Sequence, residues 1–179
     1  MALRNTIVGY GVVTRGLHWA TALAVLGALP LGLWISEMQV SLAALKYFGI
    51  HKTIGFVVLC LVVLRIVWHW WSPPPRILEH GGWQDRVARI VHRLFYVCLI
   101  LMPLSGWIAS SATGIDTVVF NTWTFPRISP VSEQVESVGF AVHGLLGLLL
   151  VALILVHLTG VLYRTFVVKD RTLARMVRG

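Results

Sequence analysis

The sequence predicts an all-α membrane protein: a single domain, residues 1–179, folded as a four-helix transmembrane bundle. Hydrophobic residues make up 57% of the chain and charged residues only 12%, whereas about 25% of an ordinary soluble domain is charged. Mean hydropathy is +0.79. Four apolar segments are each long enough to cross a bilayer, which takes ~20 helical residues. These observations favour a multi-pass protein whose main surroundings are membrane lipid.

The four helices are predicted at about residues 16–36, 47–71, 88–112 and 137–165. The first is free of charge, and the second is apolar apart from Lys52 near its start and Arg65 near its end. The third includes most of the charge-free stretch 94–115, and the fourth contains the longer charge-free stretch 137–163.

The connections contain residues that break helices. Ser72 is followed by three consecutive prolines, through which no helix continues. Gly114, Pro126 and Pro130 interrupt the connection between the third and fourth helices, residues 114–136. We expect a short surface helix within this connection, near residues 131–138.

Basic residues are distributed unequally between the two sides of the predicted bundle. The N-terminus, the loop at 65–93 and the C-terminal tail hold twelve of the fifteen Lys and Arg residues: Arg4, Arg15, Arg65, Arg76, Arg86, Arg89, Arg93, Arg164, Lys169, Arg171, Arg175 and Arg178. The other side holds Lys46, Lys52 and Arg127. Cytoplasmic loops carry such an excess, so both termini are predicted to be cytoplasmic. The net charge of +8 does not indicate nucleic-acid binding, because the basic residues flank apolar runs instead of forming a contiguous soluble face.

Two histidines stand fourteen residues apart in the fourth helix, His143 and His157. On a helix this spacing places them about 40° from alignment, on one face, and about 21 Å apart along the axis. Polar rings in an apolar span are costly and mark functional sites. Imidazole nitrogens at two depths can each hold a haem iron, so the pattern predicts two haems stacked across the membrane.

Other histidines sort by depth. His51 opens the second helix on the outer side and pairs with His143. On the inner side His157 can pair with His18 of the first helix or His92 of the third, and depth alone does not choose between them. The simpler alternative for each ring is a hydrogen bond within the bundle or a place at the headgroups. We favour this interpretation for His92, His69 and His80.

No C-x-x-C-H motif is present, and Cys60 and Cys98 lie in mid-helix. Covalent haem attachment is therefore excluded, and the haems are predicted to be b-type. Arg65 follows His51 by fourteen residues, which places it at the depth of an inner-haem propionate. Arg65 could form a bidentate pair with that carboxylate, or its side chain could reach the headgroups. The sequence favours neither interpretation over the other.

Small and aromatic residues complete the pattern. Trp19, next to His18, is a candidate for lining a haem or quinone pocket. Four glycines on the predicted helices would let a porphyrin or a neighbouring helix approach the backbone closely. These are Gly55, Gly106, Gly144 and Gly147. Tryptophans near the predicted boundaries are typical of an aromatic belt: Trp34, Trp70, Trp71, Trp83 and Trp123.

These residues together resemble the bacterial cytochrome b561 family over essentially the whole chain. The resemblance rests on Leu17-His18-Trp19, on Ile50-His51 followed by Arg65, on Pro103-Leu104-Ser105-Gly106-Trp107, on the spacing of His143 and His157, and on the tail from Lys169 to Met176. It implies a multi-pass protein of the bacterial inner membrane with two b haems. Its implied ligands are His18 with His157 for the inner haem and His51 with His143 for the outer haem.

One branch of that family is superoxide oxidase, which passes electrons from superoxide at the periplasmic face to ubiquinone. If the chain is such an enzyme, we expect Lys52 beside His51, together with Lys46, to attract the anion toward the outer haem. His92, Arg164 and Lys169 would surround the quinone, although the branch has histidine where this chain has Arg164. Other members are electron carriers, so the alternative is a carrier or anchor subunit that receives electrons from a periplasmic redox protein docked on residues 114–136.

Overall fold

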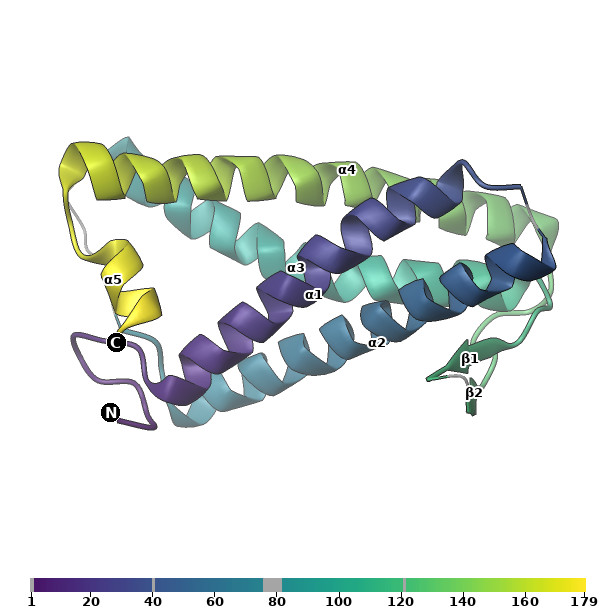
Figure 1. The fold of residues 1–179 in the computed structure, drawn as a ribbon, viewed down its shortest axis with the longest axis horizontal. Helices are drawn as coiled ribbons and strands as arrows, with labels where there is room; N and C mark the ends of the chain where they lie inside the picture. The colour runs from purple at the N-terminus through teal and green to yellow at the C-terminus, as the bar shows by residue number, and fades with distance from the viewer. Residues whose placement is uncertain (1, 40, 76–81, 121) are drawn as a thin grey trace.

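The computed structural model describes residues 2–39, 41–75, 82–120 and 122–179. Arg76 and His80 lie outside these ranges. Four long helices dominate the fold: α1 (Val12–Ser36), α2 (Leu42–Trp71), α3 (Trp83–Ala112) and α4 (Glu133–Tyr163) (Figure 1). Each is long and apolar enough to cross a membrane, so the predicted all-α architecture with four candidate spans is confirmed.

All four helices begin a few residues earlier than predicted, at Val12, Leu42, Trp83 and Glu133. The cause at α4 is an N-cap, because the Ser132 hydroxyl accepts a hydrogen bond from the backbone N–H of Val135 at 3.4 Å. Glu133 and Glu136 occupy the first turn, where a negative charge interacts favourably with the helix dipole. A criterion based on apolar residues misses such polar first turns.

The prediction of a short surface helix near residues 131–138 is wrong. Residues from Glu133 onward belong to α4 itself. The connection instead contains an antiparallel β-hairpin, β1 (Thr117–Val119) and β2 (Trp123–Phe125), in which Val118 pairs with Thr124.

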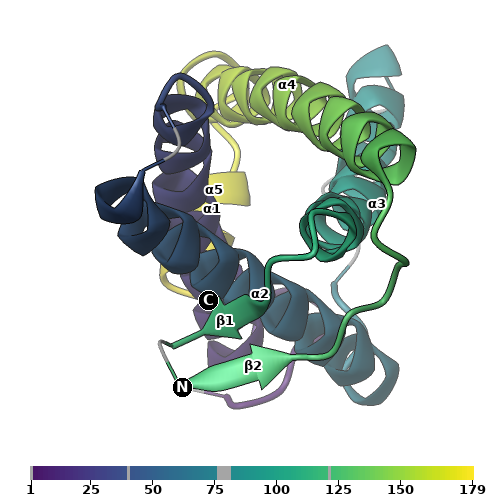
Figure 2. The same ribbon diagram turned by 90° about the vertical axis from the view of Figure 1, so that its right-hand side faces the viewer.

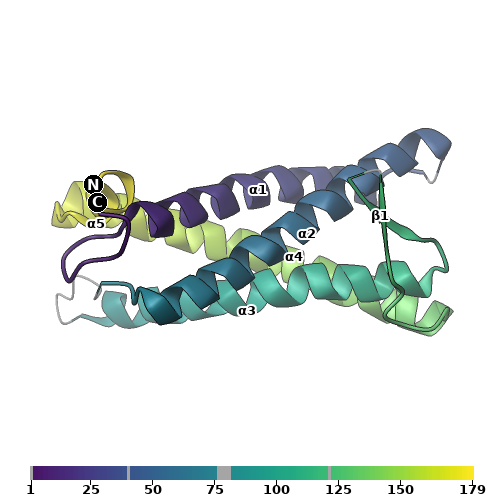
Figure 3. The ribbon, with the colours of Figure 1, turned by 90° about the horizontal axis from the view of Figure 1, so that it is seen from below.

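The helices pack as two pairs, α1 with α2 and α3 with α4, joined through α2 and α3. Across the described part of the chain, α4 makes few close backbone approaches to α1 or α2. Figure 2, which looks along the bundle, shows α4 standing apart from α2. Both chain termini lie at one end, here called the terminal end, and the β-hairpin lies at the other, here called the hairpin end (Figures 1 and 3).

A small apolar core joins the helices, and most large apolar side chains face outward. The buried cluster is rich in valine and leucine: Val25, Val58, Val62, Val91, Cys98, Leu99, Leu150 and Leu153. Leu145 and Leu148 on α4 are among the many exposed large hydrophobic residues. Such a surface is stable when lipid covers it.

After α4 the chain makes a π-helical turn, η1 (Arg164–Val168), and a short helix, α5 (Thr172–Val177), that folds back on α1. The buried guanidinium of Arg164 pairs with Asp85 at the start of α3 and with Asp170, the latter at 3.0 Å. Arg15 and Trp19 on α1 donate hydrogen bonds to the carbonyls of Val177 and Met176, at 2.7 and 3.2 Å. These contacts tie the C-terminus to three helices.

We predict that Arg164→Leu destabilises the fold by ~3–5 kcal/mol, the usual cost of removing one partner of a buried ion pair. The matched control is Arg127→Leu, which removes the exposed pair with Asp116 and should cost ~1 kcal/mol or less. Unfolding by SDS titration of the detergent-solubilised protein, followed by circular dichroism, measures both. Equal small losses in the two variants would contradict a stabilising role for the buried pair.

Candidate haem sites

At the hairpin end, His51 of α2 faces His143 of α4. Their ring centroids are 6.1 Å apart and the ring planes cross at 83°. Two imidazoles that bind one iron from opposite sides, with metal–nitrogen bonds of about 2.0–2.1 Å, have centroids about 6 Å apart. The predicted pair is therefore brought together at a separation at which both rings could hold one haem iron.

The backbone of α3 orients His143. The Nδ1 atom of its ring lies 2.9 Å from the carbonyl oxygen of Met102, and the Ser105 hydroxyl lies 3.4 Å from the same nitrogen. Nδ1 donates to the carbonyl when it carries the proton, which leaves Nε2 as the free lone pair for a metal. Such an outer hydrogen bond fixes the tautomer of most metal-binding histidines. Sequence reasoning missed this partner because a backbone carbonyl has no sequence signature.

Two glycines contact the rings of this pair. A Cβ atom on Gly32 of α1 would lie 2.8 Å from Cε1 of His51, and one on Gly106 of α3 would lie 2.9 Å from Cε1 of His143. Both distances are shorter than real contacts, so each ring occupies space that any larger residue would take. The close approach expected at Gly106 is confirmed, whereas Gly32 was not singled out from the sequence. A Cβ on Gly55 or Gly144 would meet nothing within 4 Å.

At the terminal end, His157 of α4 lies near two other histidines. Its ring centroid is 6.5 Å from that of His18 on α1 and 5.4 Å from that of His92 on α3. The Nδ1 atom of His92 lies 2.7 Å from the carbonyl of Ala88 in its own helix. Both partners that the sequence left open therefore lie near His157. The separation of His157 from His18 fits a haem as well as the separation of His51 from His143 does.

Arg65 of α2 lies beside this group. Its Nη1 atom is 3.5 Å from Nδ1 of His18, and its guanidinium carbon is 5.6 Å from the ring centroid of Tyr96. The Tyr96 hydroxyl is 3.1 Å from Nδ1 of His69. Among the described residues, the buried atoms Arg65 Nε and His69 Nε2 have no hydrogen-bond partner. Buried polar atoms seldom stay unpaired, and the donor at Arg65 fits an anionic ligand group such as a haem propionate.

Tyr96 was not identified from the sequence, and His69 was interpreted only as an interfacial residue. Their contact joins α2 to α3 across 27 positions of sequence. No periodicity within one helix could reveal it.

The remaining predicted site residues occupy different surroundings. At the hairpin end, Lys52 is half-buried directly after His51, and Lys46 is exposed near the start of α2. At the terminal end, Trp19 meets the His18 ring edge-on at 5.3 Å. Lys169 is exposed in a left-handed conformation, φ 56°, between η1 and α5. The guanidinium of Arg164 contacts Asp85 and Asp170, which makes it a support of the C-terminal segment.

The sequence profile described as prokaryotic cytochrome b561 matches residues 9–179. The chain belongs to this family. The resemblance identified from the sequence is therefore confirmed, and membership implies haem b as a cofactor. Together with the four candidate spans, it makes this cytochrome b561 a multi-pass membrane electron carrier.

Three curated relatives align over nearly their whole length. Cytochrome b561 homolog 2 of Escherichia coli (strain K12) is 32% identical over 187 residues, covering 99% of this chain and 95% of the relative. Cytochrome b561 homolog 1 of the same organism is 26% identical, covering 90% and 92%. A protein named probable superoxide oxidase CybB, from Yersinia pestis, is 25% identical and covers 94% and 95%.

We predict that Gly32→Ala and Gly106→Ala disturb the histidine pair at the hairpin end, because each added methyl group would overlap a ring. The expected result is a lower haem content by pyridine haemochrome, or a shifted low-spin signal in electron paramagnetic resonance for one of the haems. Gly27→Ala on α1 is the matched control, since a Cβ there meets nothing within 4 Å. Identical spectra for all three variants would argue against the packing of these rings on glycine.

Proposed function

We propose that this cytochrome b561 carries electrons across the membrane through two haems, oxidising superoxide at the hairpin end and reducing ubiquinone at the terminal end. The observation that carries the proposal is the pair of histidine sites on α4, fourteen residues apart and each faced by an imidazole about 6 Å away. Two superoxide anions would give up one electron each and leave as dioxygen. Ubiquinone would take both electrons and two protons to form ubiquinol.

The proposed orientation follows from charge. The terminal end carries twelve of the fifteen basic residues, which favours a cytoplasmic position for it. The hairpin end would then face the periplasm.

In this proposal His51 with His143 and His18 with His157 hold the two haems. The bound haems supply one-electron redox chemistry at two depths. Because the guanidinium of Arg65 is always a donor, its contact with Nδ1 of His18 requires that nitrogen to accept. A metal-bound His18 that keeps its proton on Nδ1 cannot accept, so Arg65 would turn to a haem propionate, a carboxylate that it can bind with two hydrogen bonds.

The superoxide end depends on Lys52 and Lys46. The formal charge of the predicted outer residues is three basic minus four acidic (Glu37, Asp116, Glu133 and Glu136), or −1. Long-range attraction of an anion is therefore weak, and the local positive charge of Lys52 beside His51 would guide the last few ångströms. The relative named probable superoxide oxidase supports this substrate.

At the terminal end, the quinone would meet His92, Lys169 and Trp19. Quinone reduction consumes protons, and an imidazole is the side chain best suited to transfer them near neutral pH. His92 lies 5.4 Å from His157, close to the site from which electrons would arrive. Arg164 would not contact the quinone itself, because its guanidinium pairs with Asp85 and Asp170. Its role would be to hold the C-terminal segment in place beside the site.

The second candidate is a carrier or anchor subunit that passes electrons between a periplasmic redox protein and quinone without a substrate site of its own. Two of the three relatives have names that specify no substrate, and the negative balance at the hairpin end suits a basic protein partner better than superoxide. Stopped-flow mixing of the oxidised protein with superoxide separates the two functions.

We predict two b haems per chain by pyridine haemochrome. His143→Ala and His157→Ala should each remove a different haem, because each imidazole serves one depth. His18→Ala should lose the haem at the terminal end and His92→Ala should keep it. Two haems in both α4 variants would refute the di-haem assignment, and loss in His92→Ala with retention in His18→Ala would transfer ligation to His92.

We predict that superoxide reduces the oxidised protein at about 10⁸ M⁻¹s⁻¹ at low salt, since a small anion meeting a cationic spot is limited by encounter. Lys52→Glu should slow this step several-fold, whereas Lys52→Arg should not. The effect should weaken with added salt, which screens charges over ~10 Å at 0.1 M. Quinone reduction by the pre-reduced variant serves as the control and should not change. Slow, salt-independent reduction of the unmodified protein would favour the carrier function.

A further inference from the structure

We propose that the β-hairpin is a lipid anchor whose aromatic tip lies in the headgroup interface of the adjacent leaflet. The inference concerns the connection that the carrier hypothesis assigns to a protein partner, and it does not depend on superoxide being the substrate. It rests on the distribution of charge, on the fixed direction of the hairpin and on its depth beside α2.

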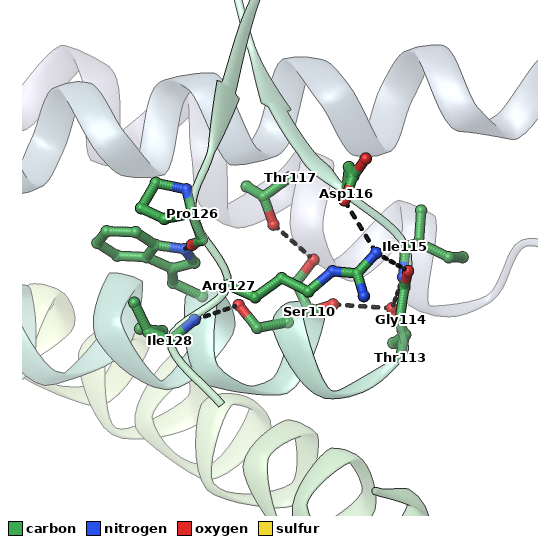
Figure 4. A network of polar contacts seen from close by, with 11 residues as sticks. Ser110, Thr113, Gly114, Ile115, Asp116, Thr117, Pro126, Arg127 and Ile128 are labelled. Carbon is green, nitrogen blue, oxygen red and sulfur yellow. Dashed lines mark hydrogen bonds and ion pairs between the residues drawn. The ribbon is translucent and has the colours of Figure 1, made fainter. Parts of the chain in front are cut away.

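Charge is confined to the base of the hairpin. Residues 117–126 include no Asp, Glu, Lys or Arg. Asp116 and Arg127 flank this stretch and pair with each other at 3.0 Å, and the same guanidinium nitrogen donates to the carbonyl of Gly114 at 2.7 Å (Figure 4). This ion pair links the two ends of the hairpin at its base, and the loop beyond it, residues 117–126, carries no charge.

The hairpin is held in one direction by α3. The Ser110 and Thr117 hydroxyls are 3.1 Å apart, and the backbone N–H of Ile128 donates to the Ser111 hydroxyl at 3.4 Å (Figure 4). Trp107 donates its indole N–H to the carbonyl of Pro126 at 3.2 Å. Figures 1 and 3 show that the hairpin crosses the side of the bundle over α2 instead of extending along the helix axes into solvent. A hairpin that points sideways from a membrane bundle runs along the bilayer surface.

The tip carries two exposed aromatic rings, and the backbone N–H groups of Phe120 and Thr122 have hydrogen-bond partners. Phe120 and Trp123 are 50% and 64% exposed, with ring centroids 6.1 Å apart. The backbone N–H of Phe120 donates to the Thr53 hydroxyl on α2 at 3.0 Å, and that of Thr122 donates to the carbonyl of Val119 at 3.3 Å. Partners for these groups matter near lipid, where water does not replace them.

The depth of the hairpin coincides with the expected edge of the hydrocarbon layer. Trp70 and Trp71 at the other end of α2 are 76% and 72% exposed, as expected of an aromatic belt. A helix crosses the hydrocarbon in ~20 residues, so the opposite edge falls near His51. The hairpin contacts α2 just inside that edge, through Thr53 and through Phe56, whose ring centroid is 4.6 Å from that of Phe125. Trp123 is on the same strand as Phe125, which places it close to this edge, the region where tryptophan is enriched.

The test is a depth measurement in nanodiscs by electron paramagnetic resonance. Single cysteines are introduced at Trp123→Cys, at Thr122→Cys, which keeps both aromatic rings, and at Gln134→Cys, an exposed position on the first turn of α4. The background is Cys60→Ala and Cys98→Ala, and the visible absorption spectrum verifies the fold. Spin labels are compared for collision with oxygen, which partitions into lipid, and with a nickel chelate, which stays in water.

We expect labels at residues 122 and 123 to collide several-fold more with oxygen relative to nickel than the label at residue 134. Equal ratios at all three positions would overturn the proposal and leave the hairpin available in water for a redox protein. The measurement needs no electron donor, so its failure is distinguishable from failure of the superoxide function.

Discussion

In the proposed di-haem function, one constraint organises the bundle: α4 must present two imidazoles, each to a different helix, without closing on either. His143 faces His51 of α2 and His157 faces His18 of α1, at centroid separations of 6.1 and 6.5 Å. Side chains packed directly would bring these helices closer than a haem permits. The chain meets the constraint by packing α4 on α3 and α1 on α2, so that each close helix pair supports one wall of the space between the histidines.

The two ends solve the same problem with different chemistry. At the hairpin end the rings are held by neutral contacts, namely the Met102 carbonyl and the glycines Gly32 and Gly106. At the terminal end the second pair lies among groups that carry charge or protons: Arg65, His69, His92 and Tyr96. That difference agrees with a reaction that consumes protons at the terminal end and only exchanges an electron at the hairpin end.

Polar contacts at each end also hold the bundle together outside the apolar core. The ion pair of Arg164 with Asp85 connects residues 79 positions apart and joins the end of α4 to the start of α3. At the other end, Arg127 and the Ser110–Thr117 contact fasten the hairpin to α3. Between lipid-exposed helices the hydrophobic effect contributes little to association, because lipid chains are as apolar as the side chains. Directional contacts at the ends therefore carry more of the specificity than they would in a soluble bundle.

The sequence by itself determined the four spans, the two histidine depths on α4 and the partnership of His51 with His143. These follow from quantities that one helix fixes alone: the length of an apolar run, the residue spacing along the axis and the side of the membrane on which each helix begins. The cytochrome b561 motifs added the family. The tertiary structure decided the contacts that depend on how one helix is rotated and tilted against another, which no single-helix period encodes. Among them are Gly32 under His51, Tyr96 against His69, and Arg164 between two carboxylates. It also decided the hairpin, where an expected surface helix gave way because Glu133 and the Ser132 cap extend α4, and because Thr53 and Phe56 of α2 hold an uncharged loop that carries no helical pattern of its own.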